Sequence, residues 1–301
     1  MIQFAANVPF WKGSLHLHTT CSDGVLTPEE VAELYRRVGY DFINITDHWK
    51  TSDYSSLSDG ILVLSGVELD NKPPYEHVHL IGVGIDPYNV APDMLDRKFM
   101  RSQSVQDNID ALLKSGGLAA LAHPAWSLNT AETVSGMNGL FALEIFNSVS
   151  GLPWNAMRQD SSYLVDVLGA RGRRLPLIAV DDAHFYKGEE CKGFVMVQSE
   201  SCTRESLLDA MRGGKFYASQ GPIIAQVDID PECLIVMTSP ASRAVFYTDA
   251  AYNSERVVQQ DGGTRWVYAR KPALDEQFVR CEIHDAQGRR AWTNPAAWLE
   301  E

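Results

Sequence analysis

The stretch Gly13-Ser14-Leu15-His16-Leu17-His18-Thr19 decides how the rest of the chain is interpreted. It places two histidines, two residues apart, at the end of an apolar run that is typical of a β-strand. Because side chains at positions i and i+2 of a strand point to the same side, His16 and His18 are expected to form one chelating pair. An isolated pair of this kind is only a weak indication of metal binding.

The same pattern recurs along the chain. Six of the eight histidines lie at the ends of apolar runs, in the company of three carboxylates. Besides the first pair, the residues concerned are Asp23, His48, Glu68, His79, His123, Asp182 and His184. Imidazole and carboxylate ligands together suit Zn, Fe and Mn. Packing does not readily explain such a distribution, so the sequence predicts a metal site.

The order of the elements indicates the fold class. Apolar β runs alternate with helical patterns up to about residue 220, which is typical of a parallel α/β barrel. Thr27-Pro28-Glu29-Glu30 predicts the start of the first helix, with Thr27 as N-cap and Glu30 completing a capping box, and Gly39 ends this helix. Further helices are expected around 92–115, 153–171 and 203–213, and strands buried on both faces at 140–146 and 175–181.

The pattern changes after Gly221-Pro222. Short alternating segments separated by turn residues predict a small antiparallel β domain. These segments are 223–229, 234–238, 244–248, 266–269 and 278–284. The sequence therefore predicts two domains, residues 1–222 and 223–301.

Composition restricts the partners that are expected. The 301-residue chain carries a formal net charge of -13, which opposes non-specific binding to long nucleic acids. No run approaches the ~20 apolar residues that span a membrane, and no secretory leader is recognisable, so a cytoplasmic location is expected. The five cysteines are odd in number and scattered, which indicates reduced thiols. His284 lies in a polar stretch and is interpreted as a surface histidine.

Six motifs carry a resemblance to a known family. They are His16-Leu17-His18 with Ser22-Asp23-Gly24, Ile45-Thr46-Asp47-His48, Gly66-Val67-Glu68, His79-x-Ile81-Gly82, Leu121-Ala122-His123-Pro124 and Asp182-Ala183-His184. In order and spacing they resemble the PHP (polymerase and histidinol phosphatase) superfamily of metal-dependent phosphoesterases, over roughly residues 12–222. This resemblance implies a distorted (β/α)7 barrel with a trinuclear site at the C-terminal ends of its strands. The segments 213–222 and 288–295 resemble a PHP branch with a C-terminal β domain, which includes hydrolases of carbamate esters.

The resemblance also implies the ligand sets of two or three divalent ions of Zn, Fe or Mn. One metal would take His16, His18, Glu68 and Asp182, a second Glu68, His79 and His123, and a third Asp23, His48 and His184. Glu68 would then bridge two metals, and Glu68, Asp182 and His184 are the predicted catalytic residues. In better-known members a histidine often stands at the position of Asp23, which leaves the identity of the third metal open.

The predicted activity is hydrolysis of a small phosphomonoester or phosphodiester. A bound metal lowers the pKa of water to about 7, so a metal-bound hydroxide is available for attack. Asn147 and Arg158 are predicted to contact the phosphate. Two alternatives are hydrolysis of a carbamate or carboxylic ester on the same scaffold and a non-catalytic PHP module. The latter often lacks ligands, whereas every expected ligand position is filled here.

Four neighbouring residues have competing interpretations. Asp47 more readily caps a turn or orients a ligand than binds a metal itself. His77 shares a strand face with His79 and is a less favoured candidate for the second metal. Trp49 and Lys50 follow His48 and either touch the substrate or belong to a solvated loop.

Overall fold

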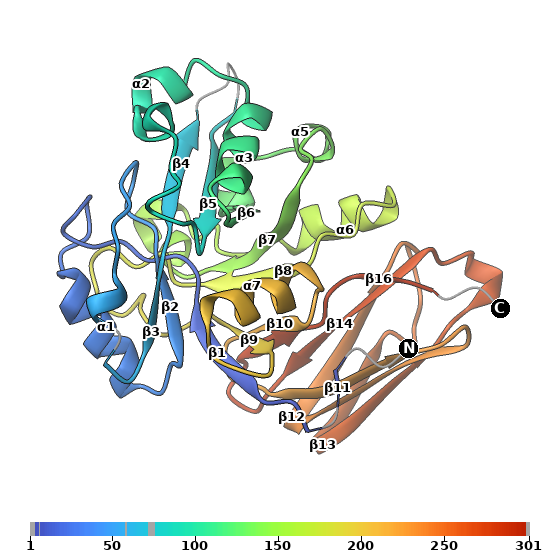
Figure 1. Ribbon diagram of the computed structural model, residues 1–301. Helices are drawn as coiled ribbons and strands as arrows, with labels where there is room; N and C mark the ends of the chain where they lie inside the picture. Colours follow the sequence, from blue (N-terminus) through green and yellow to red (C-terminus); the bar gives the residue numbers. More distant parts are fainter. Residues whose placement is uncertain (1–3, 6, 58, 72–75, 299–301) are drawn as a thin grey trace.

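The computed structural model describes residues 4, 5, 7–57, 59–71 and 76–298, and its two sheets are shown in Figure 1. Within these residues no helix combines the length and apolar character that crossing a membrane requires. All five cysteines are free, as predicted.

The larger sheet joins the first strands of the chain to the last ones. Its central path is β11 (Ile224–Ile229), β12 (Cys233–Thr248), β14 (Phe278–His284), β15 (Arg290–Trp292), β10 (Phe216–Ser219), β9 (Phe194–Gln198), β1 (Phe10–Ser14), β2 (Phe42–Ile45) and β3 (Leu62–Ser65). Two strands lie off this path: β13 (Val257–Ala269) pairs with β12, and β16 (Ala296–Ala297) pairs with β14. Strands β1, β2 and β3 are parallel, whereas β9 is antiparallel to β1.

The smaller sheet has five strands, in the order β4 (Val67–Asn71), β5 (Val78–Val83), β6 (Leu118–Leu121), β7 (Leu140–Asn147) and β8 (Leu177–Val180). The last three are parallel, but β5 is antiparallel to both of its neighbours. Only residues 72–77 separate β4 from β5, too few for the crossover that parallel strands need. The mixed α/β class is therefore confirmed, and the predicted parallel arrangement is corrected at β5, β9 and β10.

Isolated bridges join the two sheets. Leu17, just beyond β1, pairs with Ala183, just beyond β8, and His48 pairs with Glu68 in β4. One apolar cluster also draws side chains from both sheets, including Leu15, Ile81 and Ile178. The sheets thus share one interior, while a closed (β/α)7 barrel stays a prediction.

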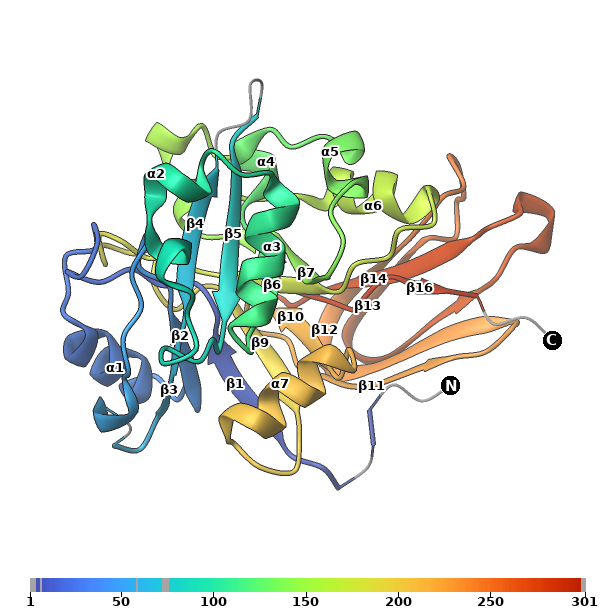
Figure 2. The same ribbon diagram turned by 45° about the horizontal axis from the view of Figure 1, so that its top comes forward.

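Helices cover the outer face of the smaller sheet. The α-helices are α1 (Pro28–Arg37), α2 (Arg97–Met100), α3 (Val105–Lys114), α4 (Pro124–Ser127), α5 (Ala131–Ser135), α6 (Ser162–Ala170) and α7 (Arg204–Arg212), and the 3₁₀ turns are η1 (Ser55–Leu57), η2 (Pro92–Leu95), η3 (Val149–Gly151), η4 (Pro153–Asn155) and η5 (Pro272–Leu274). Figure 2 shows α3 beside β5 and β6. Ile109 of α3 and Leu168 of α6 join the outer apolar cluster, whereas Leu208 of α7 packs into the interior one.

Two sequence predictions of local structure, at α1 and at β8, are confirmed. The capping box at the start of α1 is confirmed, because Thr27 Oγ1 accepts from the N–H of Glu30 and the N–H of Thr27 donates to Glu30 Oε2. In β8, Leu177 and Ala179 lie in the outer cluster, while Ile178 and Val180 lie in the interior one. This strand is therefore buried on both faces, as predicted.

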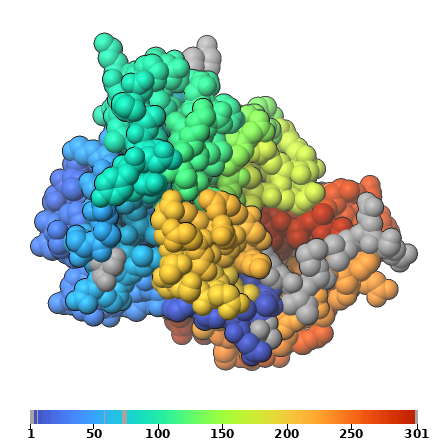
Figure 3. All heavy atoms as spheres, viewed as in Figure 1, coloured from blue at the N-terminus to red at the C-terminus, as the bar shows by residue number. Residues whose placement is uncertain are grey.

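The C-terminal strands extend the larger sheet. The predicted strands 234–238 and 244–248 are parts of one strand, β12, which continues through register shifts between Met237 and Arg243. Figure 3 shows the yellow segment around α7 on the surface, next to the green middle part of the chain and the red C-terminal part. Because β15 pairs with β10, no break in the sheet marks residue 222. The predicted domain boundary stays a prediction.

Candidate metal centre

The nine predicted ligands meet at the strand ends that the two sheets share. They form three overlapping groups: His16, His18, Glu68 and Asp182; Glu68, His79 and His123; and His18, Asp23, His48 and His184. Within each group, one ligand atom from each residue lies within 4.8 Å of the others. The structure thus brings together the three sets expected from the sequence, with His18 shared between the first and the third.

The first group is buried. Nε2 of His16 and Nε2 of His18 are 3.2 Å apart, and each lies 3.1 Å from Oδ1 of Asp182. This carboxylate oxygen has no hydrogen-bond partner among the described residues, although it is buried. A buried acceptor without a partner is costly. A cation between these four side chains would remove that cost, so the donor set fits a metal ion.

Glu68 connects two groups through its two oxygens. Oε1 lies 2.7 Å from Nδ1 of His79 and 3.2 Å from Nε2 of His123. Oε2 lies 3.3 Å from Nε2 of His16, 3.1 Å from Nε2 of His18 and 3.3 Å from Nδ1 of His48. Each oxygen therefore faces a different set of histidines, which is the arrangement that a bridging carboxylate requires.

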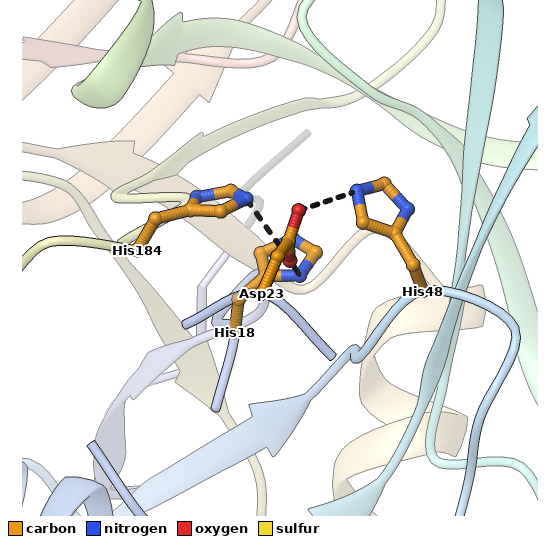
Figure 4. A group of neighbouring side chains, drawn as sticks. All are labelled: His18, Asp23, His48 and His184. Carbon is orange, nitrogen blue, oxygen red and sulfur yellow. Dashed lines mark ion pairs between the residues drawn. The ribbon is translucent and has the colours of Figure 1, made fainter. Parts of the chain in front are cut away.

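The third group is the most open, and its side chains point toward one another in Figure 4. Asp23 Oδ1 lies 3.4 Å from Nδ1 of His18 and 3.6 Å from Nε2 of His184, and its Oδ2 lies 3.7 Å from Nε2 of His48. The side chain of Asp23 is 55% exposed. Nδ1 of His184 donates to the backbone carbonyl of Asp182 at 2.7 Å, which leaves Nε2 of this ring free to bind a metal.

Glu144 is a supporting residue that sequence reasoning missed. Its Oε1 accepts from Nδ1 of His16 at 2.7 Å, and its Oε2 accepts from the backbone N–H of His123 at 2.6 Å. The first contact keeps Nε2 of His16 directed at the cluster, as is common for ligands of metal sites. The available signal was a single carboxylate inside the apolar run Leu143-Glu144-Ile145.

Two ligands come from strand ends with an uncommon backbone. His123 follows β6 with φ of 27°, and Asp182 follows β8 with φ of 52°. Positive φ is rare for residues other than glycine, although Asp and His adopt it more often than most. The turn changes the direction of each side chain where the strand ends, so strand alternation alone does not determine where these two ligands point.

Electrostatics favours positive charge at this cluster. Burial alone would lower the pKa of His16, but Asp182, Glu144 and Glu68 raise it to about 10. Burial would likewise raise the pKa of Glu68, yet the surrounding histidines hold it well below its usual range. Carboxylates that attract protons to imidazoles also attract metal ions, which compete for the same nitrogen atoms.

The competing interpretations of the neighbouring residues are resolved by their contacts. Asp47 accepts from the N–H of Thr19 at 2.8 Å and from Oγ of Ser22 at 2.5 Å, so it orders the loop that leads to Asp23. His77 is exposed and lies outside the three groups.

Trp49 and Lys50 do not line the cavity at the metal centre. The indole N–H of Trp49 donates to Asp70, and the ammonium group of Lys50 donates to the backbone carbonyl of Cys21. The structure therefore gives no support to the interpretation that Trp49 and Lys50 touch the substrate.

Three further predictions need revision. Asn147 is buried; its amide nitrogen donates to Glu144 and Asp182, and its Oδ1 accepts from the N–H of Ser150, so it holds the cluster together instead of facing the cavity. Arg158 is exposed and does not line the cavity. The surface interpretation of His284 is wrong, because its ring is 14% exposed and lies 2.8 Å from Oε1 of Glu282.

A cavity of about 280 Å³ opens onto the metal centre. Seven of the predicted ligands contribute to its wall: Asp23, His48, Glu68, His79, His123, Asp182 and His184. The remaining wall consists of Trp126, Val149, Ser150, Trp154, Asn155 and Phe185. Ligand cavities commonly measure about 300–1,000 Å³, so this one suits a small molecule.

Comparisons with known proteins agree with these observations. No family model matches the chain. A 3',5'-nucleoside bisphosphate phosphatase of Chromobacterium violaceum is 36% identical over 78 residues, which are 24% of this chain and 27% of that protein. A 5'-3' exoribonuclease of Haemophilus influenzae is 27% identical over 112 residues, 35% of this chain and 41% of that protein. The chain thus spans less than half the length of these curated relatives.

A solved structure resembles almost the whole chain. It is a two-domain protein from Bacteroides vulgatus that contains a predicted PHP-like metal-dependent phosphoesterase. The TM-score is 0.56 at 14% identity, and the match covers 93% of this chain and 92% of that protein. At this identity the likeness shows a shared fold: the chain has a mixed α/β fold similar to that of a PHP-like protein.

Proposed function

We propose that this protein is a PHP-type metal-dependent hydrolase that cleaves small phosphate esters, either phosphomonoesters or phosphodiesters. The observation that carries this proposal is the convergence of nine donor residues, in three overlapping groups, on one small cavity. The names of the two curated relatives, a phosphatase and a ribonuclease, support a phosphate ester as the substrate. The proposal includes a distorted (β/α)7 barrel and two or three ions of Zn, Fe or Mn.

Each ligand group would hold one ion, with Glu68 and His18 shared between groups. Divalent ions lower the pKa of water and stabilise the charge that develops on phosphoryl oxygens. The chain contributes by fixing its donors before substrate binds. Glu144 orients His16, and Asn147 holds Asp182 in place. The buried floor of the cluster excludes bulk water, so the substrate is expected to enter from the open side beside Asp23.

Hydrolysis of a carbamate or carboxylic ester is the alternative on the same scaffold. A single carbonyl oxygen would need fewer cations than a phosphoryl group. A non-catalytic PHP module is less consistent with the site, because all nine expected donors are present and gathered in space. Neither the C-terminal resemblance to carbamate hydrolases nor the cytoplasmic location goes beyond a prediction.

Metal analysis followed by a substrate screen tests the proposal. Protein purified without oxygen is expected to carry two or three equivalents of Zn, Fe or Mn. It should cleave phosphate esters, lose this activity on chelation and regain it when the metal is returned. Carbamates and carboxylic esters are assayed in parallel. A fully metallated protein that cleaves carbamates but no phosphate ester would contradict the proposal.

A further inference from the structure

The part of the cavity wall that is not formed by the predicted ligands is largely aromatic and has no positively charged side chain. Trp126, Trp154 and Phe185 contribute to it, together with Val149, Ser150 and Asn155. No lysine or arginine is among the described residues that line the cavity. Positive charge is therefore expected only where the metal ions bind.

Trp154 and Phe185 form a corner at the mouth. Their ring centroids are 6.0 Å apart, with an angle of 82° between the ring planes. Trp154 is 69% exposed and Phe185 39% exposed, so both rings present apolar surface to a ligand in the cavity. A flat ring that enters this corner can stack on the face of one side chain and meet the edge of the other.

Polar contacts hold both sides of the corner in place. The backbone N–H groups of Phe185 and Tyr186 donate to Oε1 of Glu189 at 2.5 and 2.6 Å. On the other side, Asn155 accepts from Nε1 of Trp126 at 3.2 Å and donates to the carbonyl of Val149 at 2.9 Å. The two exposed rings thus extend from fixed backbone, so little ordering is needed when a ligand binds.

We infer that the substrate carries a single phosphoryl group on a flat, uncharged ring system that packs against Trp154 and Phe185. This inference rests on the proposed function and adds its substrate class. A second phosphate would meet no cationic side chain on the aromatic part of the wall. The protein would then differ from the relative that is named for a nucleoside 3',5'-bisphosphate.

Binding of two phosphonates that are not hydrolysed tests the inference. Phenylphosphonate and methylphosphonate both carry one phosphorus group and differ in the flat ring. By calorimetry, the metal-loaded protein should bind phenylphosphonate about 10-fold more tightly, in line with the strength of aromatic stacking. Trp154→Ala and Phe185→Ala should each reduce this preference several-fold, while the Kd of methylphosphonate and the metal content stay unchanged. Trp154→Phe should restore most of the preference.

Tyr252→Ala is the matched control, because Tyr252 is an aromatic residue that is 80% exposed and lies outside the cavity. The inference is overturned if the two phosphonates bind equally, or if the preference survives in both alanine variants. Either result leaves the proposed function standing. If neither phosphonate binds to the metal-loaded protein, the proposed function fails and the inference fails with it.

Hydrolysis assays identify the source of the ring and the number of phosphates. Phenyl phosphate carries the ring next to the phosphoryl group, whereas adenosine 5'-monophosphate carries it beyond a ribose. Cleavage of either compound supports the inference. The compound with the higher kcat/KM shows whether the ring belongs to an aryl phosphate or to a nucleotide. Adenosine 3',5'-bisphosphate should have a kcat/KM no higher than that of the monophosphate. A 10-fold preference for the bisphosphate would contradict the single-phosphate assignment.

Discussion

At the scale of single residues, Glu68 belongs to two of the three candidate ligand groups. Its two oxygens face different histidines, so removing the negative charge should weaken two sites together. Glu68→Gln is expected to lose at least two metal equivalents, whereas His79→Ala, which alters one group, should lose one. Elemental analysis after purification measures this difference. Full metal content and unchanged activity in Glu68→Gln would refute the bridging role, and Glu205→Gln on the exposed face of α7 is the matched control.

Replacing Asp23 tests whether the third ligand group contributes to phosphoryl transfer. Its contacts with the histidines are 3.4–3.7 Å long and its carboxylate is the most exposed of the centre, so its loss should spare the other two groups. Asp23→Ala is expected to reduce phosphoesterase turnover by a factor on the order of 100, equivalent to ~2.7 kcal/mol of barrier. Steady-state kinetics and metal counting on the same sample check this expectation. A variant that loses one metal but retains turnover would remove the third site from the mechanism.

The sequence predicts which donor residues come together because the chemistry that distinguishes them is local. A histidine at the end of an apolar run can be identified without knowing the fold, and all nine predicted donors meet in the structure. Glu144 was missed because nothing in the sequence shows which ring its carboxylate faces. Asn147 was predicted to contact the phosphate, whereas in the structure it donates to Glu144 and Asp182, and these hydrogen bonds depend on tertiary packing.

At the scale of elements, local signals predict where helices and strands lie but not how distant strands pair. The capping box of α1 is encoded in four consecutive residues and is confirmed. The antiparallel direction of β5 follows from the short connection after β4, which the alternating pattern of apolar runs does not reveal. Strand β12 continues past Ser239-Pro240 because it exchanges partners there, from β11 to β14, while β13 stays paired along it.

The N-cap of helix α3, which packs against the smaller sheet, is expected to contribute to the stability of the fold. Ser104 caps it: its Oγ accepts from the N–H of Asp107 at 3.1 Å, and its own N–H donates to Oδ2 of Asp107 at 3.0 Å. Ser104→Ala should lower the free energy of unfolding by about 1 kcal/mol, without changing metal content. Urea denaturation measures the loss, with Ser56→Ala as an exposed control. Equal stability of the two variants would show that the cap contributes little.

At the scale of the whole molecule, polar contacts tie the C-terminal strands to α6 and the loop before it. The guanidinium group of Arg280, which is fully buried, donates to both oxygens of Asp166 at 2.7 and 2.9 Å. Arg290 pairs with Asp160, just before α6. Together with the continuous sheet through β15 and β10, these contacts indicate that both parts of the chain are held in one fixed arrangement.

Glu282 makes this junction sensitive to pH. Burial would raise its pKa, but His284, Arg290 and Arg280 hold it below the ordinary value of 4.5. A carboxyl group whose pKa is lowered on folding stabilises the native state above the unfolded pKa, and this contribution is lost as pH falls through the folded value. The difference in unfolding free energy between the parent protein and Glu282→Gln should therefore be largest near pH 7 and shrink below about pH 4.5. Urea titrations across this range test it, and a constant difference would contradict the assignment.

We propose that the three overlapping groups of residues hold metal ions at the cavity. The most direct test is a crystal structure with anomalous diffraction measured at the absorption edges of Zn, Fe and Mn. We predict two or three anomalous peaks, each within bonding distance of one group, with Glu68 bound to two of them. Metal-loaded crystals that show no peak beside Glu68, or peaks only elsewhere on the protein, would contradict the account.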